Sequence, residues 1–167
     1  MTQPAPPPTD LFSPADVVIH AVSPNLVKAR VITLLAWMLP LLLASGVAAL
    51  AHSPWWLIMF GSFAALTAWG CWLARRQAKA IGYAERDEDL LIRKGIMWRS
   101  LVVVPYGRMQ FVDVTAGPLD RALGIAKVQL HTASASTDAN IPGLVPAEAE
   151  RLRDRLTARG EARLAGL

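Results

Sequence analysis

The sequence has few of the residues from which disulfide frameworks, metal centres and catalytic sets are built. Its single cysteine, Cys71, excludes an intramolecular disulfide and, without a basic partner nearby, is expected to be an inert thiol. The three histidines, His20, His52 and His131, lie in separate segments, too dispersed for ordinary metal-ligand spacing. No glycine-containing segment matches a phosphate-binding loop. We therefore expect no catalytic residues, no metal, no cofactor and no enzymatic activity.

Charge is also missing from one long stretch. Residues 31–74 contain no Asp, Glu, Lys or Arg, although the chain of 167 residues carries 17 basic and 13 acidic side chains. Two apolar runs, residues 31–51 and 55–74, each reach the length of about 20 residues that a helix needs to cross a bilayer. Neither run has the polar stripe with which a soluble core helix faces water. The pattern predicts two transmembrane helices rather than a buried soluble hairpin.

Aromatic and basic residues mark the expected membrane boundaries. Trp55 and Trp56 lie at the turn between the runs, and Trp69 and Trp72 near the opposite boundary, where indole rings are half wet. Basic residues flank only the outer ends of the hairpin: Lys28, Arg30, Arg75, Arg76 and Lys79. The positive-inside rule then predicts that both termini are cytoplasmic. For Arg75, Arg76 and Lys79, attraction of anionic lipid is the alternative to a role in orientation alone.

The two ends of the chain have different patterns. Residues 1–22 are expected to form a disordered, proline-rich tail because they have little to bury. The other end predicts an amphipathic helix that starts near Pro146 and stops at Gly160, with residues 161–167 as a flexible tail. Its apolar stripe is thin, which favours docking on its own domain over lying on a membrane: Ala149, Leu152 and Leu156.

Between residues 77 and 142 short segments alternate with turn signals, as in a small β domain. Six of them predict strands: AIGYAER, LLIRKG, SLVVVPY, RMQFVDVTAG, AKVQLHTAS and ANIPGL. PLDRALG is expected to be a short helical turn, and His131 a half-exposed strand residue rather than a base. The predicted fold class is a membrane α-hairpin followed by an α+β, mainly β domain, a small barrel or orthogonal sandwich under a C-terminal helix.

Residues 102–156 resemble the bacterial pleckstrin-homology-like (PH-like) domains of the DUF304, or bPH2, type. The resemblance rests on VPYGRMQFVDV, GPLDRALGIAKVQLHTAS and IPGL before the final helix. Two spans directly upstream are similar to the YdbS-like members of that family. The resemblance implies a bent antiparallel sheet capped by a C-terminal helix at residues 77–160, after a transmembrane hairpin at residues 23–76, in the bacterial plasma membrane as a multi-pass protein.

Eukaryotic PH domains that bind phosphoinositides use a basic first hairpin loop. The matching loop here is taken as ERDEDL, residues 85–90, which is acidic: Glu85, Asp87, Glu88 and Asp89. These carboxylates have the wrong charge for grasping phosphate and are expected to be solvated. Phosphoinositide recognition of the eukaryotic kind is therefore not expected.

Two functions remain open at this point. The first is a non-enzymatic adaptor that holds the PH-like domain at the cytoplasmic face and binds another membrane protein or a second copy. The second is recognition of anionic lipid by Arg75, Arg76 and Lys79 together with a basic face on the sheet: Arg93, Lys94, Arg99 and Arg108. Besides the bilayer itself, neither a nucleic acid nor a small-molecule substrate is expected as a partner.

Overall fold

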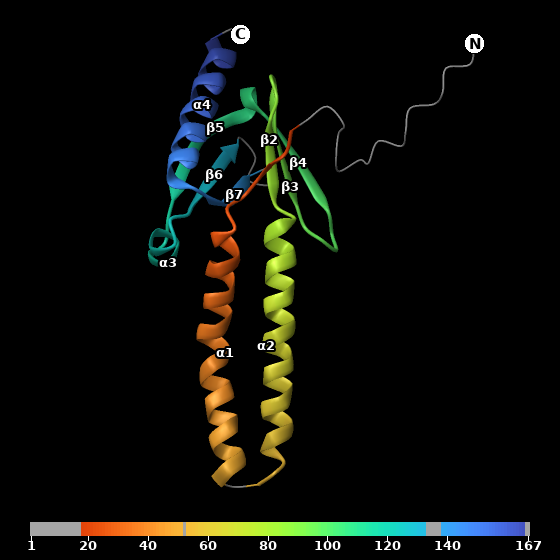
Figure 1. Cartoon of the computed structure of the whole chain (residues 1–167). Coiled ribbons are helices and arrows are strands. Elements are labelled where there is room, and N and C mark those ends of the chain that lie inside the picture. The colour runs from red at the N-terminus through yellow and green to blue at the C-terminus, as the bar shows by residue number, and fades with distance from the viewer. Residues whose placement is uncertain (1–17, 52, 133–137, 166–167) are drawn as a thin grey trace, which may run out of the picture.

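Two long antiparallel helices project from one end of a domain of strands and further helices (Figure 1). The structure, a computed structural model, describes residues 18–51, 53–132 and 138–165. Its helical elements are α1 (Asn25–Ala51), α2 (Trp56–Lys79), the 3-10 helix η1 (Tyr106–Arg108), α3 (Pro118–Ala122) and α4 (Pro146–Ala165). Its strands are β1 (His20–Ala21), β2 (Gly82–Glu85), β3 (Asp89–Lys94), β4 (Ser100–Pro105), β5 (Met109–Thr115), β6 (Ala126–Thr132) and β7 (Ala139–Leu144).

Within residues 31–74, helices α1 and α2 are apolar on all sides and lie outside the main core of the domain. Their most apolar stretches have mean hydropathies of 2.1 and 1.6, and only 6% and 11% of the residues there are buried. Polar side chains inside them bond to their own backbone: the Ser45 hydroxyl donates to the Leu41 carbonyl at 2.8 Å, and that of Thr67 to Phe63 at 2.7 Å. Both helices are thus long and apolar enough to cross a membrane.

The strands form two antiparallel sheets, as the alternating segments predict. Four strands pair in the order β1-β2-β3-β4, and three in the order β5-β6-β7. All six quoted segments contain a strand, and the PLDRALG turn is α3. The expected fold class, an apolar helical hairpin with a PH-like domain of antiparallel sheets and a C-terminal helix, is confirmed.

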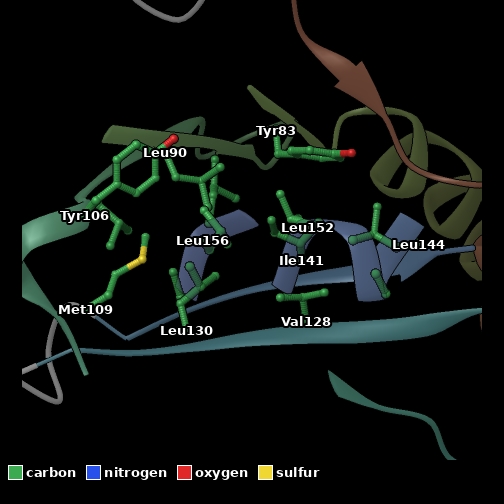
Figure 2. Close-up of a cluster of buried hydrophobic side chains, with 14 of the residues drawn as sticks. Tyr83, Leu90, Tyr106, Met109, Val128, Leu130, Ile141, Leu144, Leu152 and Leu156 are labelled. Carbon is green, nitrogen blue, oxygen red and sulfur yellow. The ribbon is translucent and has the colours of Figure 1, made fainter. Parts of the chain in front are cut away.

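The main core lies between the two sheets and α4 (Figure 2). The predicted stripe of α4 supplies three side chains with no exposed surface: Ala149, Leu152 and Leu156. They pack with β2–β7 side chains that include Tyr83, Leu90, Val128, Leu130 and Ile141. Helix α4 does not stop at Gly160 as predicted but continues to Ala165. Gly160 is buried within the helix, and a Cβ there would lie 3.7 Å from the Tyr106 carbonyl oxygen, an ordinary van der Waals distance.

A second apolar cluster joins the helices to the domain. It combines α1, α2 and the segments that follow α2 and α3: Leu26, Ala29, Ala78, Ile81 and Ile125. The Asn25 side-chain amide donates to the Leu123 carbonyl at 2.9 Å, and the Ser23 N–H donates to the Gly143 carbonyl at 2.8 Å. Gly143 has φ +78°, and a Cβ there would lie 2.7 Å from Leu26 Cβ. These contacts therefore hold the domain in one position against the ends of α1 and α2, and we call this contact region the seat.

The first strand changes the expected domain boundaries. His20 and Ala21, placed in the tail by the sequence analysis, pair with Tyr83 and Gly82 of β2. The helical hairpin is thus inserted between the first and second strands of the sheet, and the domain does not begin at residue 77. The first strand connection is the hairpin itself, whereas ERDEDL is the second, so the loop match proposed from the sequence was wrong. Residues 161–165, expected to be a tail, belong to α4.

Candidate functional site

A cavity of about 480 Å³ lies where the β3–β4 turn meets the domain ends of α1 and α2. Its lining combines three parts of the chain. These are one α1 residue, the last turns of α2 with the chain just after it, and the end of β3 with the β3–β4 turn. These residues are Arg30, Trp72, Leu73, Arg76, Gln77, Ile81, Lys94, Gly95, Ile96, Met97 and Trp98. The lining contains three cations and no carboxylate, and the rest is mainly apolar. This composition suits an anion that carries an apolar part.

The three cations of the cavity are held by neutral neighbours. Arg30 Nη1 donates to Gln77 Oε1 at 3.3 Å, and Lys94 Nζ donates to Asn140 Oδ1 at 2.9 Å. The Arg76 guanidinium lies over the Trp72 ring, with its Cζ 4.9 Å from the ring centroid. These contacts position the positive charges without neutralising them.

Lys94 is the cation of this group that lies outside the helical hairpin. Burial lowers the pKa of Lys94, and repulsion from the Lys127 ammonium lowers it further. Both causes disfavour the charged form of the amine. An anion bound in the cavity would reverse this effect, because an opposite charge nearby favours the ammonium.

The β3–β4 turn, residues 95–99, places two large apolar side chains in solvent. Gly95 adopts φ +89°, a conformation that side chains disfavour, and a Cβ there would collide with the Trp98 carbonyl. The turn leaves Met97 82% and Trp98 83% exposed, among the highest values of the described side chains. Because Met97 and Trp98 also line the cavity, this exposed tip lies beside the ends of the helices.

The structure brings together only some of the predicted site residues. Arg30, Trp72, Arg76 and Lys94 share the cavity, whereas Lys28, Arg75 and Lys79 are exposed on the same helix ends. Trp55, Trp56 and Trp69 are exposed on the hairpin surface. Arg93 lies next to Lys94 at the end of β3, and Arg99 is exposed in the turn. Arg108 is in η1, beyond the far end of β4, so the four sheet cations do not share one face.

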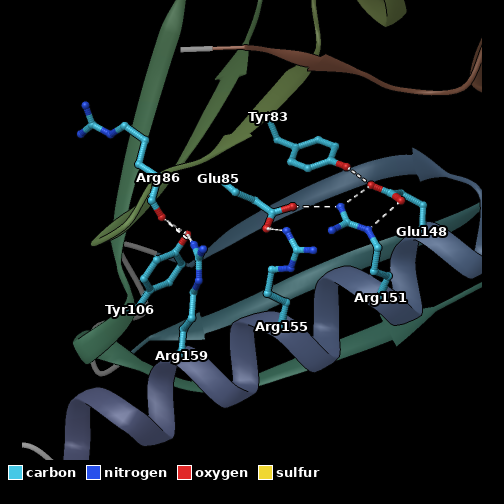
Figure 3. Close-up of polar contacts among 8 residues, drawn as sticks. All are labelled: Tyr83, Glu85, Arg86, Tyr106, Glu148, Arg151, Arg155 and Arg159. Atoms are coloured by element: carbon cyan, nitrogen blue, oxygen red, sulfur yellow. Dashed lines mark hydrogen bonds and ion pairs between the residues drawn. The ribbon is translucent and has the colours of Figure 1, made fainter. Parts of the chain in front are cut away.

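A polar network fastens α4 to β2 and was not predicted (Figure 3). The Tyr83 hydroxyl donates to Glu148 Oε1 at 2.5 Å, and Arg151 Nη2 donates to the same oxygen at 2.6 Å. Glu85 accepts from Arg151 at 2.9 Å and from Arg155 at 3.0 Å. Glu85, expected to be solvated, is instead paired, and its side chain is only 9% exposed. Exposed Glu88 pairs with Arg163 at 3.2 Å, and Asp89 with Arg86 at 2.7 Å.

The ionisation of these groups follows from their contacts. The hydrogen bond from Arg151 is the main cause that lowers the pKa of Glu148 to about 2, and the one from Tyr83 adds to it. Burial raises the pKa of Tyr83, and the hydrogen bond to Glu148 raises it further. A groove of about 760 Å³ beside the network is lined by Glu85, Glu148, Arg151 and Arg155, which already bind one another. The network thus has a structural role, which is to attach α4 to β2.

His131 behaves as a strand residue of intermediate exposure. Its ring stacks on Phe111 with centroids 4.2 Å apart, and its Nδ1 lies 3.3 Å from an Asp138 oxygen. Within residues 18–51, 53–132 and 138–165, no group of three His, Cys, Asp or Glu side chains is placed to hold a metal ion.

The chain combines two apolar helices with a domain of antiparallel sheets packed against a C-terminal helix. This architecture defines a membrane protein with a PH-like domain. The chain belongs to the bacterial PH domain family, bPH_2, whose match covers residues 16–160. It is similar to the UPF0699 transmembrane protein YdbS of Bacillus subtilis (strain 168), with 37% identity over 75 residues. That alignment covers 45% of this chain and 46% of the relative, less than half of its length. No solved structure gives a significant match.

The family match confirms the resemblance drawn from the sequence and extends it. It begins at residue 16, ahead of β1, and runs through the helical hairpin into α4. Such an extent agrees with a PH-like domain whose first strand precedes the two apolar helices.

Proposed function

We propose that this protein is a non-enzymatic adaptor, which presents its PH-like domain at the cytoplasmic face of the bacterial plasma membrane to another membrane protein. The single observation that carries this proposal is the open edge of β4. The seat on the helix ends supports it, because a domain held in one orientation presents the same edge to every neighbour in the membrane.

Strand pairing supports a topology with both flanks of the hairpin on one side. His20 pairs with Tyr83, and Ala21 with Gly82, although the whole hairpin lies between them. The chain must therefore cross the membrane an even number of times between these residues, as two spans do. The basic residues at the domain end of both helices favour the cytoplasm for that side. We therefore propose that the protein is multi-pass with both termini cytoplasmic.

Strand β4 has the features of a template for an added strand. It is the last strand in the order β1-β2-β3-β4, and among the described residues no further strand pairs with it. Its sequence, SLVVVP, has no charged residue, its register with β3 is unbroken, and Val103 is 47% exposed. Edge strands in soluble proteins are usually protected by charges, prolines or bulges, and β4 has only a proline, Pro105, at its last position. The edge strand β5 has both a charge, Asp113, and a register shift after Met109. An extended segment of a partner is the natural occupant of the β4 edge.

The test places a charge on this edge. The full-length protein and its Val103→Lys variant are crosslinked briefly in the native membrane, extracted gently and analysed for stoichiometric partners. We expect a membrane-protein partner with the wild type and a loss of about tenfold or more with Val103→Lys. The matched control is Val145→Lys, because Val145 is 51% exposed and lies outside the sheets. Equal recovery with both variants would overturn the proposal, whereas recovery of a second copy would identify a homo-oligomer as the occupant.

Recognition of anionic lipid is the second candidate function. The observation that favours it is the gathering of cations at one end of the helix pair: Lys28, Arg30, Arg75, Arg76 and Lys79. Each is worth on the order of 1 kcal/mol against an anionic surface. Native mass spectrometry of the full-length protein, titrated with phosphatidylglycerol or phosphatidylcholine, should show more bound phosphatidylglycerol, with the excess reduced at high salt. Equal binding of the two lipids would contradict this function.

A further inference from the structure

We infer that the β3–β4 turn is a third membrane contact and that the cavity behind it binds the phosphate headgroup of one anionic phospholipid. This inference rests on the second candidate function and assigns it a site. It does not depend on the adaptor proposal. Three independent features support it, namely the depth of the turn, the exposure of its tip and the chemistry of the cavity.

The depth of the turn follows from the residues that it faces. The charge-free stretch of the chain ends at Arg30 on one side and at Arg75 on the other, so these residues mark the boundary of the hydrocarbon layer. The cavity contains Arg30 and Arg76, and also Trp72 and Leu73 on the lipid side of them. Because the turn closes the same cavity, its tip lies at the level of the lipid headgroups.

The residues at the tip of the β3–β4 turn are of the types found at the level of the lipid headgroups. Met97 and Trp98 are 82% and 83% exposed, although they are among the largest apolar side chains of the domain. Tryptophan is enriched at the boundary between lipid and water, where its ring is buried while its N–H stays hydrated. Val103 and Phe111, the exposed apolar residues elsewhere on the sheets, lie on strands rather than on a turn beside the helices. A turn that reaches the interface explains why Met97 and Trp98 are uncovered.

The residues that line the cavity indicate that its ligand is a phospholipid headgroup. Arg30, Arg76 and Lys94 converge on it from α1, α2 and β3, and no carboxylate lines it. Cations held by neutral partners are suited to a phosphate, which accepts charge-assisted hydrogen bonds from several donors. The apolar lining, including Ile81, Ile96 and Leu73, suits the glycerol and first methylenes of a lipid better than a free anion. A second membrane protein would not bring a phosphate to this level, so the lipid is the better fit.

The headgroup site is tested by removing single charges from the full-length protein. Arg76→Gln and Lys94→Gln are titrated with phosphatidylglycerol in neutral detergent micelles, and the first bound lipid is counted by native mass spectrometry. We expect each variant to bind it about tenfold more weakly, as for the loss of a hydrogen bond to a charged group. Arg75→Gln is the matched control, because it removes the same charge one residue away and does not line the cavity. It should weaken binding of the first lipid much less than Arg76→Gln does, because a neutral micelle offers no anionic surface for Arg75 to attract.

Each outcome of this titration has a defined meaning. If Arg75→Gln weakens binding as much as Arg76→Gln, the helix ends act as a diffuse charge and the cavity is not the site. If wild type binds phosphatidylcholine and phosphatidylglycerol equally, the second candidate function fails together with the site. If inorganic phosphate at equal concentration displaces the lipid, the site is for a free anion and the lipid assignment is wrong. Thermal melts that match wild type show that the variants are folded.

The membrane contact of the turn is tested by the depth of a probe. In a Cys71→Ser background, a cysteine replaces Met97, or Arg108 as the control, and is labelled with an environment-sensitive fluorophore. Arg108 lies beyond the other end of six-residue β4, about 17 Å along an extended strand. In nanodiscs, we expect lipid-borne quenchers to reduce the signal at position 97 at least twofold more than at position 108. Equal quenching at both positions would show that the turn stays in water, and the inference would be overturned.

Discussion

Neutralising Glu148 should loosen the attachment of α4 to β2, and the pH dependence of stability reveals this effect. Glu148 accepts hydrogen bonds from Tyr83 at 2.5 Å and from Arg151 at 2.6 and 2.9 Å. These contacts lower its pKa from an ordinary 4.5 to about 2. Because the folded pKa lies below the unfolded one, the stabilisation is complete above pH 4.5. It is lost progressively as the pH falls toward 2.

The size of the effect follows from the shift and from the exposure of the carboxylate. A shift from 4.5 to about 2 corresponds to about 3 kcal/mol at 1.36 kcal/mol per pKa unit. The Glu148 side chain is 35% exposed, so solvent screening reduces this to about 1–2 kcal/mol. Glu148→Gln should therefore be less stable than the wild type by about 1–2 kcal/mol at pH 7. The gap should close as the pH approaches 2, because the wild-type carboxylate is then protonated.

The assay is a urea titration of the full-length protein in nanodiscs of neutral lipid, followed by circular dichroism between pH 7 and pH 3. Neutral lipid is chosen because anionic headgroups titrate in the same range. Glu150→Gln is the control, since Glu150 is exposed on the same helix two residues away. We expect its stability to follow the wild type at every pH. If Glu148→Gln and the wild type lost stability in parallel below pH 5, the hydrogen bonds of Glu148 would not be the cause and the reasoning would be refuted.

Three further predictions concern the seat, the core and the topology. Gly143→Ala should destabilise the domain by about 1–3 kcal/mol, because φ is +78° and the new methyl meets Leu26. Gly124→Ala, with φ +64° and open space, should lose less in the same urea titration. Leu152→Ala, fully buried between the sheets and α4, should lose about 2–5 kcal/mol in that titration. Deleting residues 56–74 should separate β1 from β2 across the membrane, and limited proteolysis should then cut the domain faster than in the wild type.

Local patterns predicted most of the fold. The absence of charge from residues 31–74 predicts the helical hairpin, because this signal lies within the segment itself and does not depend on contacts with distant residues. The stripe of Ala149, Leu152 and Leu156 predicts the buried face of α4 for the same reason, since a helix repeats its own face every three or four residues. The six strand segments were likewise recognisable from alternation and turn residues.

The features that the sequence did not predict depend on contacts between distant residues. β1 pairs only two residues with β2, too few for a strand pattern, and its partner lies beyond the whole hairpin. Glu85 reads as part of an acidic loop until α4 brings Arg151 and Arg155 to it. Arg30, Arg76 and Lys94 were each singled out, but only the return of the β3–β4 turn to the helix ends shows that they share a cavity. Gly160 was predicted to end the last helix because glycine is common just past helix ends, but α4 continues to Ala165.

The insertion of the hairpin between β1 and β2 also determines the order in which this protein can be assembled. During synthesis β1 emerges first and has no partner until two helices have been made. Joining strands so far apart in the chain normally carries an entropic cost for closing the loop. Here insertion of both helices brings Asn25 and Lys79 to the same end of the hairpin, and the loop is closed before the strands meet. A chain in which the second helix fails to insert is left with an unpaired edge on β2, the kind of exposed strand by which quality-control factors can distinguish a misassembled protein from a finished one.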